Sequence, residues 1–349
     1  MNEFAAARGI ITDGLAARAF PAAVVDVGRR EGSIWCEPFG RLSYEPTAHT
    51  CGLDTIFDLA SLTKVVATAS AAMRLVGAQR LSLDDKISQH LATWRGDDRE
   101  AVTIRQLLDH SSGLPAHARL WERAAGRTEY ERVLAALPLE RAPRPSAVYS
   151  DPGFMLLGFI LADAGGAPLD SQFATLSAEL GDIVRYRPSH DLVERIAPTE
   201  NDPWRGRLLR GEVHDENAAA LGGIAGHAGL FGTAGAVAAF ARLVLQTFHD
   251  TTALGDPSLM RAFATRSDVP GSSRALAWDT MLPTSSCGTR MSPTSIGHTG
   301  FTGTSLWIDW EKDLYVVFLT NRVHPTRAND ALAKLRPALH DAIVSAVED

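Results

Sequence analysis

Residues 305–320, Ser-Leu-Trp-Ile-Asp-Trp-Glu-Lys-Asp-Leu-Tyr-Val-Val-Phe-Leu-Thr, decide the fold. Two apolar runs, Ser305–Asp309 and Leu314–Thr320, flank the four residues 310–313, three of which are charged. This alternation of apolar runs and a polar turn predicts a β-hairpin. Because the second run is apolar almost throughout, we expect it to lie in the middle of a sheet, with both faces covered.

The amino end of the chain carries a second, weaker hairpin pattern. Ala22–Val27 and Ser33–Cys36 are apolar segments separated by the polar, glycine-containing residues 28–32. The stretch between the two hairpins is helical in character, with apolar residues at helical spacing in Ser61–Val76, Ile104–Asp109, Tyr130–Ala136, Phe154–Ala164 and Ala234–Thr247. Strands at both ends around a helical middle predict an α+β fold, in which one antiparallel sheet is assembled from both chain ends and flanked by helices.

This pattern divides the chain into two regions within one domain. We expect a discontinuous sheet region, residues 1–60 and 270–349, and a mainly helical region, residues 61–269. Residues 328–347 have helical spacing as well, and we expect Pro337 to kink or restart that helix. The proline- and glycine-rich segments 138–145 and 188–203 predict ordered loops.

Composition excludes several classes of function. The chain has 349 residues, 45% of them hydrophobic, and a net charge of −7 without a basic run, so we expect no nucleic-acid partner. Its most apolar stretch, Leu221–Leu245, is interrupted by glycines, His227 and Arg242, which predicts no membrane span. Residues 1–20 lack the pattern of a secretory signal, so we expect a cytoplasmic protein. Three cysteines without paired spacing predict reduced, structural thiols.

The first candidate for chemistry is Ser61-Leu62-Thr63-Lys64, which opens the long apolar helical segment. Residues three apart share a helix face, so the Ser61 hydroxyl and the Lys64 amine can meet, and the Ser61 N–H at the helix start can face an oxyanion. The alternative is a capped helix with a surface lysine. Lys64 is one of only four lysines and its neighbours are small or apolar, which argues against a solvated amine.

The second candidate is Tyr149-Ser150-Asp151, at the junction between a proline-rich loop and an apolar segment. Tyr149 can serve as an acid or base, and Asp151 can pair with Lys64. The alternative is that Ser150 or Asp151 only caps the helix that begins near Pro152.

The third candidate is His298-Thr299-Gly300, directly before the carboxyl-terminal hairpin. Glycine lets a ligand approach a strand closely, and a backbone N–H just beyond it can donate to an oxyanion. Alone, His298 reads equally well as an ordinary turn histidine.

Residues 211–217 concentrate polar groups, among them His214-Asp215-Glu216. Adjacent side chains on one strand or turn rarely converge on one ion, so we expect no metal here. The sequence leaves the role of these three residues open and favours a loop that lines the rim of a cleft or forms hydrogen bonds within it.

Together and in this order, the three candidate motifs resemble those of the penicillin-binding protein and β-lactamase superfamily of serine hydrolases. The second motif contains a tyrosine, and in this it is similar to the second motif of class C β-lactamases, related DD-peptidases and family VIII carboxylesterases. Residues 107–114, Leu-Leu-Asp-His-Ser-Ser-Gly-Leu, and the glycine-rich residues 222–230 extend the resemblance over nearly the whole chain. The resemblance implies the β-lactamase/DD-peptidase-like fold, with the active site between the sheet and the helical region.

The resemblance also implies acyl transfer without a metal or organic cofactor. Ser61 would attack a carbonyl, and Lys64 and Tyr149 would together carry out the proton transfers. The N–H groups of Ser61 and Phe301 would hold the oxyanion. Asp151 and the residues His298, Thr299 and Gly300 would contact the substrate.

Two residues depart from the usual motifs. Asp151 replaces the usual asparagine, so we expect a protonated Lys64 that depresses the pKa of Tyr149 and leaves Tyr149 as the base. His298 replaces the usual lysine, and a neutral imidazole attracts a carboxylate less than an ammonium does, so we expect short esters to be better substrates than β-lactams.

The functional hypothesis is therefore a serine hydrolase that acts on a small ester, amide or muropeptide. A β-lactamase with weak or moderate turnover is one alternative, and a noncatalytic sensor of penicillins or muropeptides is another from a different class. The sequence does not determine the oligomeric state.

Overall fold

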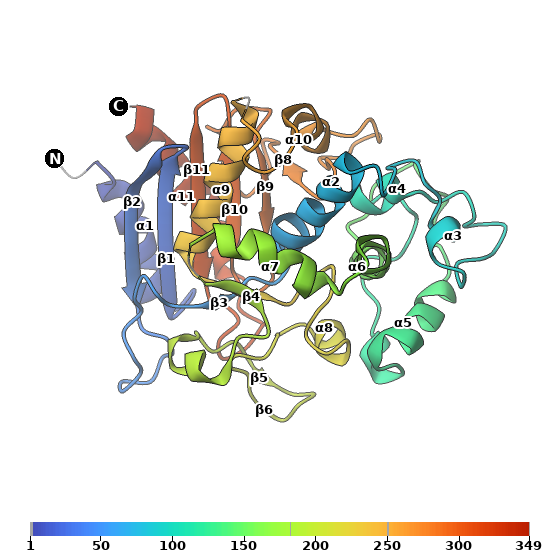
Figure 1. Cartoon of the computed structure of the whole chain (residues 1–349). Helices are drawn as coiled ribbons and strands as arrows, with labels where there is room; N and C mark the ends of the chain where they lie inside the picture. Colours follow the sequence, from blue (N-terminus) through green and yellow to red (C-terminus); the bar gives the residue numbers. More distant parts are fainter. Residues whose placement is uncertain (1–2, 182, 250, 349) are drawn as a thin grey trace.

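The computed structural model describes residues 3–181, 183–249 and 251–348. Its main sheet is antiparallel, with the strand order β2-β1-β11-β10-β9-β8 (Figure 1). The strands are β1 (Ala22–Arg29), β2 (Gly32–Gly40), β8 (Asp279–Thr280), β9 (Ile296–Thr299), β10 (Ser305–Asp309) and β11 (Leu314–Thr320). Both predicted hairpins are confirmed, and β1 pairs with β11, so the two chain ends form one sheet.

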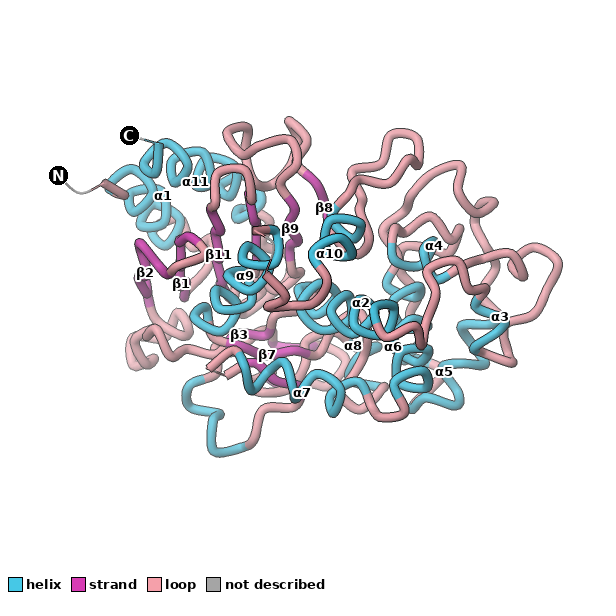
Figure 2. The backbone as a smooth tube through the Cα atoms, turned by 45° about the horizontal axis from the view of Figure 1, so that its top comes forward, coloured by secondary structure: helices cyan, strands magenta, loops and turns pink. Residues whose placement is uncertain are grey.

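Alternating side chains of this sheet belong to two separate cores. Val25 and Phe318 face the core that the sheet shares with α1 (Ala5–Ala16) and α11 (Ala331–Glu348). Val24 and Val317 face the other core, which includes α9 (Ala234–Phe248). In Figures 1 and 2, α1 and α11 lie together on one face of the sheet and α9 lies on the other. Coverage of both faces explains why β11 is apolar along its whole length.

The remaining helices form a second body beside the sheet (Figure 1). They are the π-helical segment η1 (Lys64–Ala69), α2 (Ser70–Gly77), α3 (Ile87–His90), α4 (Ile104–Leu108), the 3₁₀ turn η2 (Leu120–Glu122), α5 (Gly126–Ala135), α6 (Asp151–Gly165), α7 (Leu169–Glu179), η3 (His190–Arg195), α8 (Glu216–Ala220) and α10 (Pro257–Ala264). All five predicted helical segments are found within this set or in α9. The sequence did not predict α1, α3, α7, α8 or α10.

Two local expectations need correction. The helix expected over 61–76 begins just after Ser61, and its first part, η1, has π-helical bonding before α2 continues it. The final helix, α11, continues through Pro337 as one element, so it does not restart there, and a kink at Pro337 stays a prediction. In addition, α9 packs on the sheet although it comes from the stretch expected to be mainly helical; the division into two regions remains a prediction.

Short strands join the two bodies. One small sheet has the order β3-β7-β4, and a two-stranded sheet pairs β5 with β6; these strands are Phe57–Asp58, Leu230–Gly232, Val184–Tyr186, Asn201–Asp202 and Arg207–Leu208. The three cysteines are unpaired. Within the described ranges, no single helix is long and apolar enough to cross a membrane, and only α6 and α7 taken together, with an 81° bend between them, reach that composition.

A close contact between two glycines fixes the helical body against the glycine-rich loop. A Cβ atom built on Gly226 would lie 2.9 Å from the backbone nitrogen of Gly158 on α6 and would collide with the carbonyl oxygen of Phe154. The neighbouring Gly226 carbonyl accepts a hydrogen bond of 2.6 Å from Thr68 on η1. The loop around His227 is therefore held close to both η1 and α6.

We expect Gly226→Ala to lower the free energy of unfolding by about 2 kcal/mol or more, because backbone atoms of α6 must move to admit a methyl group. Urea denaturation measures this change. The matched control is Gly9→Ala on the exposed face of α1, where no atom lies within 4 Å of the added Cβ. That variant should be neutral or more stable by about 0.5–1 kcal/mol. Equal stability of the two variants would contradict the close-packing account.

Candidate active site

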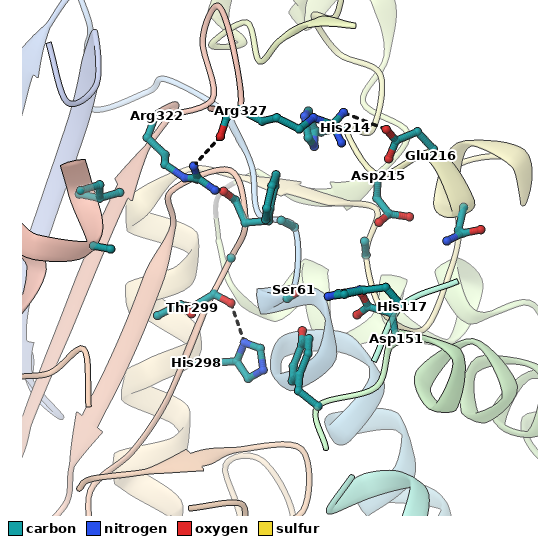
Figure 3. A pocket seen from close by; sticks show the side chains of 18 of the residues that line it. Ser61, His117, Asp151, His214, Asp215, Glu216, His298, Thr299, Arg322 and Arg327 are labelled. Carbon is teal, nitrogen blue, oxygen red and sulfur yellow. Dashed lines mark hydrogen bonds and ion pairs between the residues drawn. The ribbon is translucent and has the colours of Figure 1, made fainter. Parts of the chain in front are cut away.

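A cavity of about 690 Å³ lies where the sheet meets the helical body. Its walls come from Ala60 and Ser61 between β3 and η1, the loop before α6, the segment around α8, the end of β9 and the start of α11 (Figure 3). Most of the predicted site residues line it, namely Ser61, Tyr149, Asp151, His298, Thr299, Gly300 and Phe301. Lys64 lies directly behind Ser61 and has no exposed surface. The structure therefore brings all three sequence motifs to one place.

The Lys64 ammonium is the most completely enclosed charge in this site. Its Nζ atom donates to Ser61 Oγ at 3.0 Å, to Asp151 Oδ1 at 2.7 Å and to the carbonyl oxygen of His227 at 3.0 Å. All three protons of an ammonium group thus have an acceptor. The alternative of a surface lysine is wrong. The π-helical turn that starts at Lys64 changes the helix register at this position, as such turns often do at functional sites.

Charge, rather than burial, decides the protonation of this pair. Burial alone would lower the pKa of Lys64, but the Asp151 carboxylate, with a smaller contribution from Tyr149, offsets it, so the pKa of Lys64 is raised. Burial would raise the pKa of Asp151, yet Lys64 and a hydrogen bond from His117 hold that pKa well below its usual range. At neutral pH the pair is therefore an ammonium and a carboxylate, as the sequence predicted.

Tyr149 differs from the expectation. Lys64 lies 4.8 Å from the centre of its ring and, as expected, favours the phenolate. Burial is the larger effect, however, and the pKa of Tyr149 is raised above its ordinary value. Lys64 does lower this pKa, as expected, but the sequence gave no measure of how deeply the phenol is enclosed, and burial outweighs the effect of Lys64. At neutral pH Tyr149 is a neutral phenol.

The capping alternative for the second motif holds for one of its residues only. Ser150 is the N-cap of α6, and its hydroxyl accepts a hydrogen bond from the Gly153 N–H at 3.2 Å. Asp151 is the first residue of the helix, and its side chain turns away from the helix end to bond Lys64. Ser150 therefore positions the chain so that Asp151 can reach the buried cation.

His298 is neutral in this site. Burial lowers its pKa well below the ordinary value, and the nearby cations Arg274 and Lys64 lower it further. Its Nδ1–H donates to the Thr299 carbonyl at 2.8 Å, which leaves Nε2 as a buried acceptor without a partner among the described residues. The expectation of a largely neutral imidazole agrees with this environment.

Two backbone N–H groups are available to an oxyanion. Neither the Ser61 nor the Phe301 N–H has a hydrogen-bond partner in the described parts of the chain, and both residues line the cavity. A Cβ on Gly300 would lie 2.6 Å from the Leu59 carbonyl oxygen, so only glycine allows this approach. Thr304 locks it by donating to the same carbonyl at 3.0 Å.

Three functional candidates were missed by the sequence analysis. His117 lies on the open side of Asp151, with Nδ1 2.8 Å from Oδ2, and this contact raises the pKa of His117. Arg274 lies 5.1 Å from the centre of the Tyr149 ring. His110, from the stretch 107–114, accepts a hydrogen bond from the Ser150 N–H at 3.0 Å. His117 and Arg274 stand in loops without a motif of their own, so only the tertiary structure identifies them.

The polar segment 214–216 lines the cavity rim, as predicted, but its side chains point to three different partners. His214 pairs with Glu200 at 2.8 Å, and Glu216 pairs with Arg327 at 2.8 Å. Asp215 caps α8 and bonds His227 at 2.7 Å. Each side chain therefore has a structural partner of its own.

We expect Asp151→Asn to move the rising limb of the pH–rate profile to lower pH. Without the carboxylate, burial dominates, so the pKa of Lys64 falls and the Lys64–Tyr149 pair gives up a proton earlier as the pH increases. The measurement is kcat/KM for a p-nitrophenyl ester between about pH 5 and 10, the range in which perturbed Lys and Tyr groups titrate. An unchanged profile would mean that Asp151 does not set the charge of Lys64. Tyr149→Phe, by comparison, should lower the rate far more at every pH.

Comparison with known proteins agrees with this geometry. A sequence profile of the β-lactamase family matches residues 7–339. A putative D-alanyl-D-alanine carboxypeptidase of Escherichia coli K12 is 32% identical, over 81% of this chain and 72% of its own.

Solved structures confirm the predicted fold. A class C β-lactamase from Rhodobacter sphaeroides superimposes with a TM-score of 0.75 at 20% identity, covering 97% of this chain and 99% of its own. EstCE1, a hydrolase with promiscuous acyltransferase activity, gives 0.76 at 20% identity, covering 97% and 98%. The profile match, the carboxypeptidase-like relative and the shared fold together establish that the chain belongs to the β-lactamase family of serine hydrolases.

Proposed function

We propose that the protein hydrolyses an ester or amide through a covalent acyl-enzyme on Ser61. One observation supports this above all others: the Ser61 hydroxyl lies 3.0 Å from the buried Lys64 amine, at the wall of a cavity with two N–H groups that have no partner in the described parts of the chain. A nucleophile, a proton-transfer group and an oxyanion site within reach of one point are what acyl transfer requires.

Acylation begins from a site that holds one proton too many. Both Lys64 and Tyr149 have raised pKa values, so the pair must lose a proton before it can accept one from Ser61. Ser61 Oγ then bonds to the carbonyl carbon, and its proton passes to the Lys64–Tyr149 pair. The N–H groups of Ser61 and Phe301 stabilise the negative oxygen. The pair returns the proton to the leaving group as its bond to carbon breaks.

Deacylation repeats these steps with water. The same pair takes a proton from a water molecule that attacks the ester carbonyl on Ser61, and then returns it to Ser61 Oγ. Lys64 stays cationic beside Asp151 in this scheme and acts mainly by its field. A noncatalytic sensor would use Ser61 but would not need the second half of the cycle.

Arg274 bears on the substrate class. The neutral His298 cannot hold a carboxylate by charge, and this was the argument for neutral esters. Arg274 supplies a cation at the same end of the cavity, close enough to His298 to lower its pKa. We infer that a substrate carboxylate lies between the two, as in peptides that end in D-alanine. The name of the Escherichia coli relative, a putative D-alanyl-D-alanine carboxypeptidase, supports the same class.

We expect a fluorophosphonate probe to add once per chain, at Ser61, and we expect Ser61→Ala to lose the adduct together with a factor on the order of 10³ or more in rate. Intact-mass and peptide mass spectrometry locate the adduct. Ser171→Ala, at an exposed serine of α7, is the matched control and should keep both. An adduct that survives Ser61→Ala, or a burst of one product per chain without further turnover, would contradict the proposal.

We expect Arg274→Gln to lower kcat/KM about 10- to 100-fold for an acyl-D-alanyl-D-alanine peptide, since a charge-assisted hydrogen bond contributes roughly 1.5–3 kcal/mol. The same peptide with a terminal amide isolates the carboxylate, and its already low kcat/KM should fall much less. Arg274→Lys should restore part of the loss. An equal loss for both peptides would show that Arg274 supports the fold of the site rather than the carboxylate.

A further inference from the structure

The lining of the active-site cavity includes three arginines from the segment after β11, and Figure 3 shows two of them, Arg322 and Arg327, at one end. Arg322 and Arg327 come from the segment between β11 and α11, and Arg336 comes from α11 itself. In Figure 3, Ser61 lies between this end of the cavity, marked by Arg322 and Arg327, and the opposite end, marked by His298. The cavity therefore extends on both sides of the proposed nucleophile.

Among the described residues, only Arg327 of these three arginines forms an ion pair with an acid, although Glu200 and Asp330 lie close enough to Arg322 to favour its charged form. Arg327 pairs with Glu200 at 2.6 Å and with Glu216 at 2.8 Å. Arg322 donates only to backbone carbonyls, those of Phe301, Arg327 and Asn329. Its guanidinium lies 4.6 Å from the centre of the Phe301 ring, which places it beside the residue whose N–H faces the cavity. Asp330, an exposed carboxylate on the same wall, forms no ion pair with Arg322 or Arg336.

Of the two arginines without an ion pair, Arg322 and Arg336, Arg336 is the more deeply buried. It is 93% buried, and its side chain has no hydrogen bond or ion pair with any residue in 3–181, 183–249 and 251–348. One turn further along α11, His340 is buried without a hydrogen-bond partner among the described residues, and burial and Arg336 lower its pKa to about 3, so it is a neutral imidazole beside the guanidinium. Burial and Arg322 lower the pKa of Arg336 to about 10, which still leaves it charged at neutral pH.

Of the Arg336 nitrogens only Nε is fully enclosed without a partner, and the residue lines the cavity. A largely buried guanidinium without a countercharge is costly, and an apolar side chain of similar size would serve the packing of α11 better. Folding therefore gives no reason for a charge at this position. An anion that enters the cavity would supply the missing acceptors, and guanidinium groups match carboxylates and phosphates in geometry.

We propose that Arg322 and Arg336 form an anion-binding subsite for the acyl part of the substrate. This inference rests on the proposed function, because the leaving group is assigned to the His298 and Arg274 end and the acyl part must then extend past Phe301. The substrate class is thus an ester or amide whose acyl group ends in a carboxylate or a phosphate-type group. Together with Arg274, the subsite fits a substrate with an anion at each end.

The test compares matched p-nitrophenyl esters. The adipate and suberate monoesters carry a carboxylate at the end of the acyl chain, 6-phosphonohexanoate carries a phosphonate, and hexanoate and octanoate are the neutral references. The readout within each protein is the ratio of kcat/KM for an anionic ester to that for its neutral reference. We expect this ratio to be about tenfold or more in the wild-type protein for at least one anion, and the better anion identifies the chemistry of the natural group.

Three variants connect the ratio to the subsite. Arg322→Gln and Arg336→Gln should each reduce it at least fivefold, and Arg336→Lys should retain part of it. Arg119→Gln is the matched control, because it removes the same charge from a largely exposed residue that lines another part of the cavity. A wild-type ratio near one with good turnover of the neutral esters would overturn the subsite and leave the proposed function intact. An equal decrease of the ratio in Arg119→Gln would also overturn it.

A binding measurement covers the case in which no ester is hydrolysed. Calorimetric titration with adipate and with inorganic phosphate at low salt needs no turnover. We expect at least one of them to bind the wild-type protein at least fivefold more tightly than Arg322→Gln or Arg336→Gln, and equally tightly to Arg119→Gln. If neither anion binds, or if all four proteins bind alike, the subsite is wrong whatever becomes of the acyl-enzyme.

Discussion

The buried ion pair between Lys64 and Asp151 is the interaction on which the rest of the site depends. A lysine without exposed surface is tolerated only when its charge is fully matched, and here a carboxylate, a hydroxyl and a carbonyl surround it. These three acceptors come from three parts of the chain, namely the entry to η1, the first residue of α6 and the glycine-rich loop before β7. Each of them must be in place for the cation to be stable. The ion pair thus couples the packing of the helical body to the charge presented to Ser61.

The main sheet contributes the other half of the site through its position. Because β9 and β10 pair beside β11, the turn between them is carried to the end of β3, where Gly300 approaches the Leu59 carbonyl and Phe301 faces the cavity. The same construction opens the cavity toward the start of α11. One helix that covers the outer face of the sheet therefore also delivers Arg336 to the far end of the active site.

The sequence predicted much of this arrangement and missed specific parts for physical reasons. The boundaries of β10 and β11 are as predicted, because a hairpin with apolar runs and a charged turn is a local signal. α1 was not predicted, because Gly9 and Gly14 weaken its helix signal and its stability comes from packing on α11. The pairing of Lys64 with Asp151 was predicted from the opposite charges of two motif residues, whereas the net pKa of Tyr149 depends on burial. His117, Arg274 and Arg336 acquire meaning only from neighbours that are distant in the sequence.

The central claim is that Lys64 is an ammonium in the resting protein because Asp151 holds it there. Nitrogen-15 NMR of lysine-labelled protein measures this directly, since the chain has only four lysines and the other three can be assigned by Lys→Arg substitution. The account predicts that the Nζ signal of Lys64 keeps its ammonium shift from neutral pH to beyond the ordinary pKa of lysine. A Lys64 signal that titrates near neutral pH would contradict it, because the amine would then be the base and Asp151 would not determine its charge.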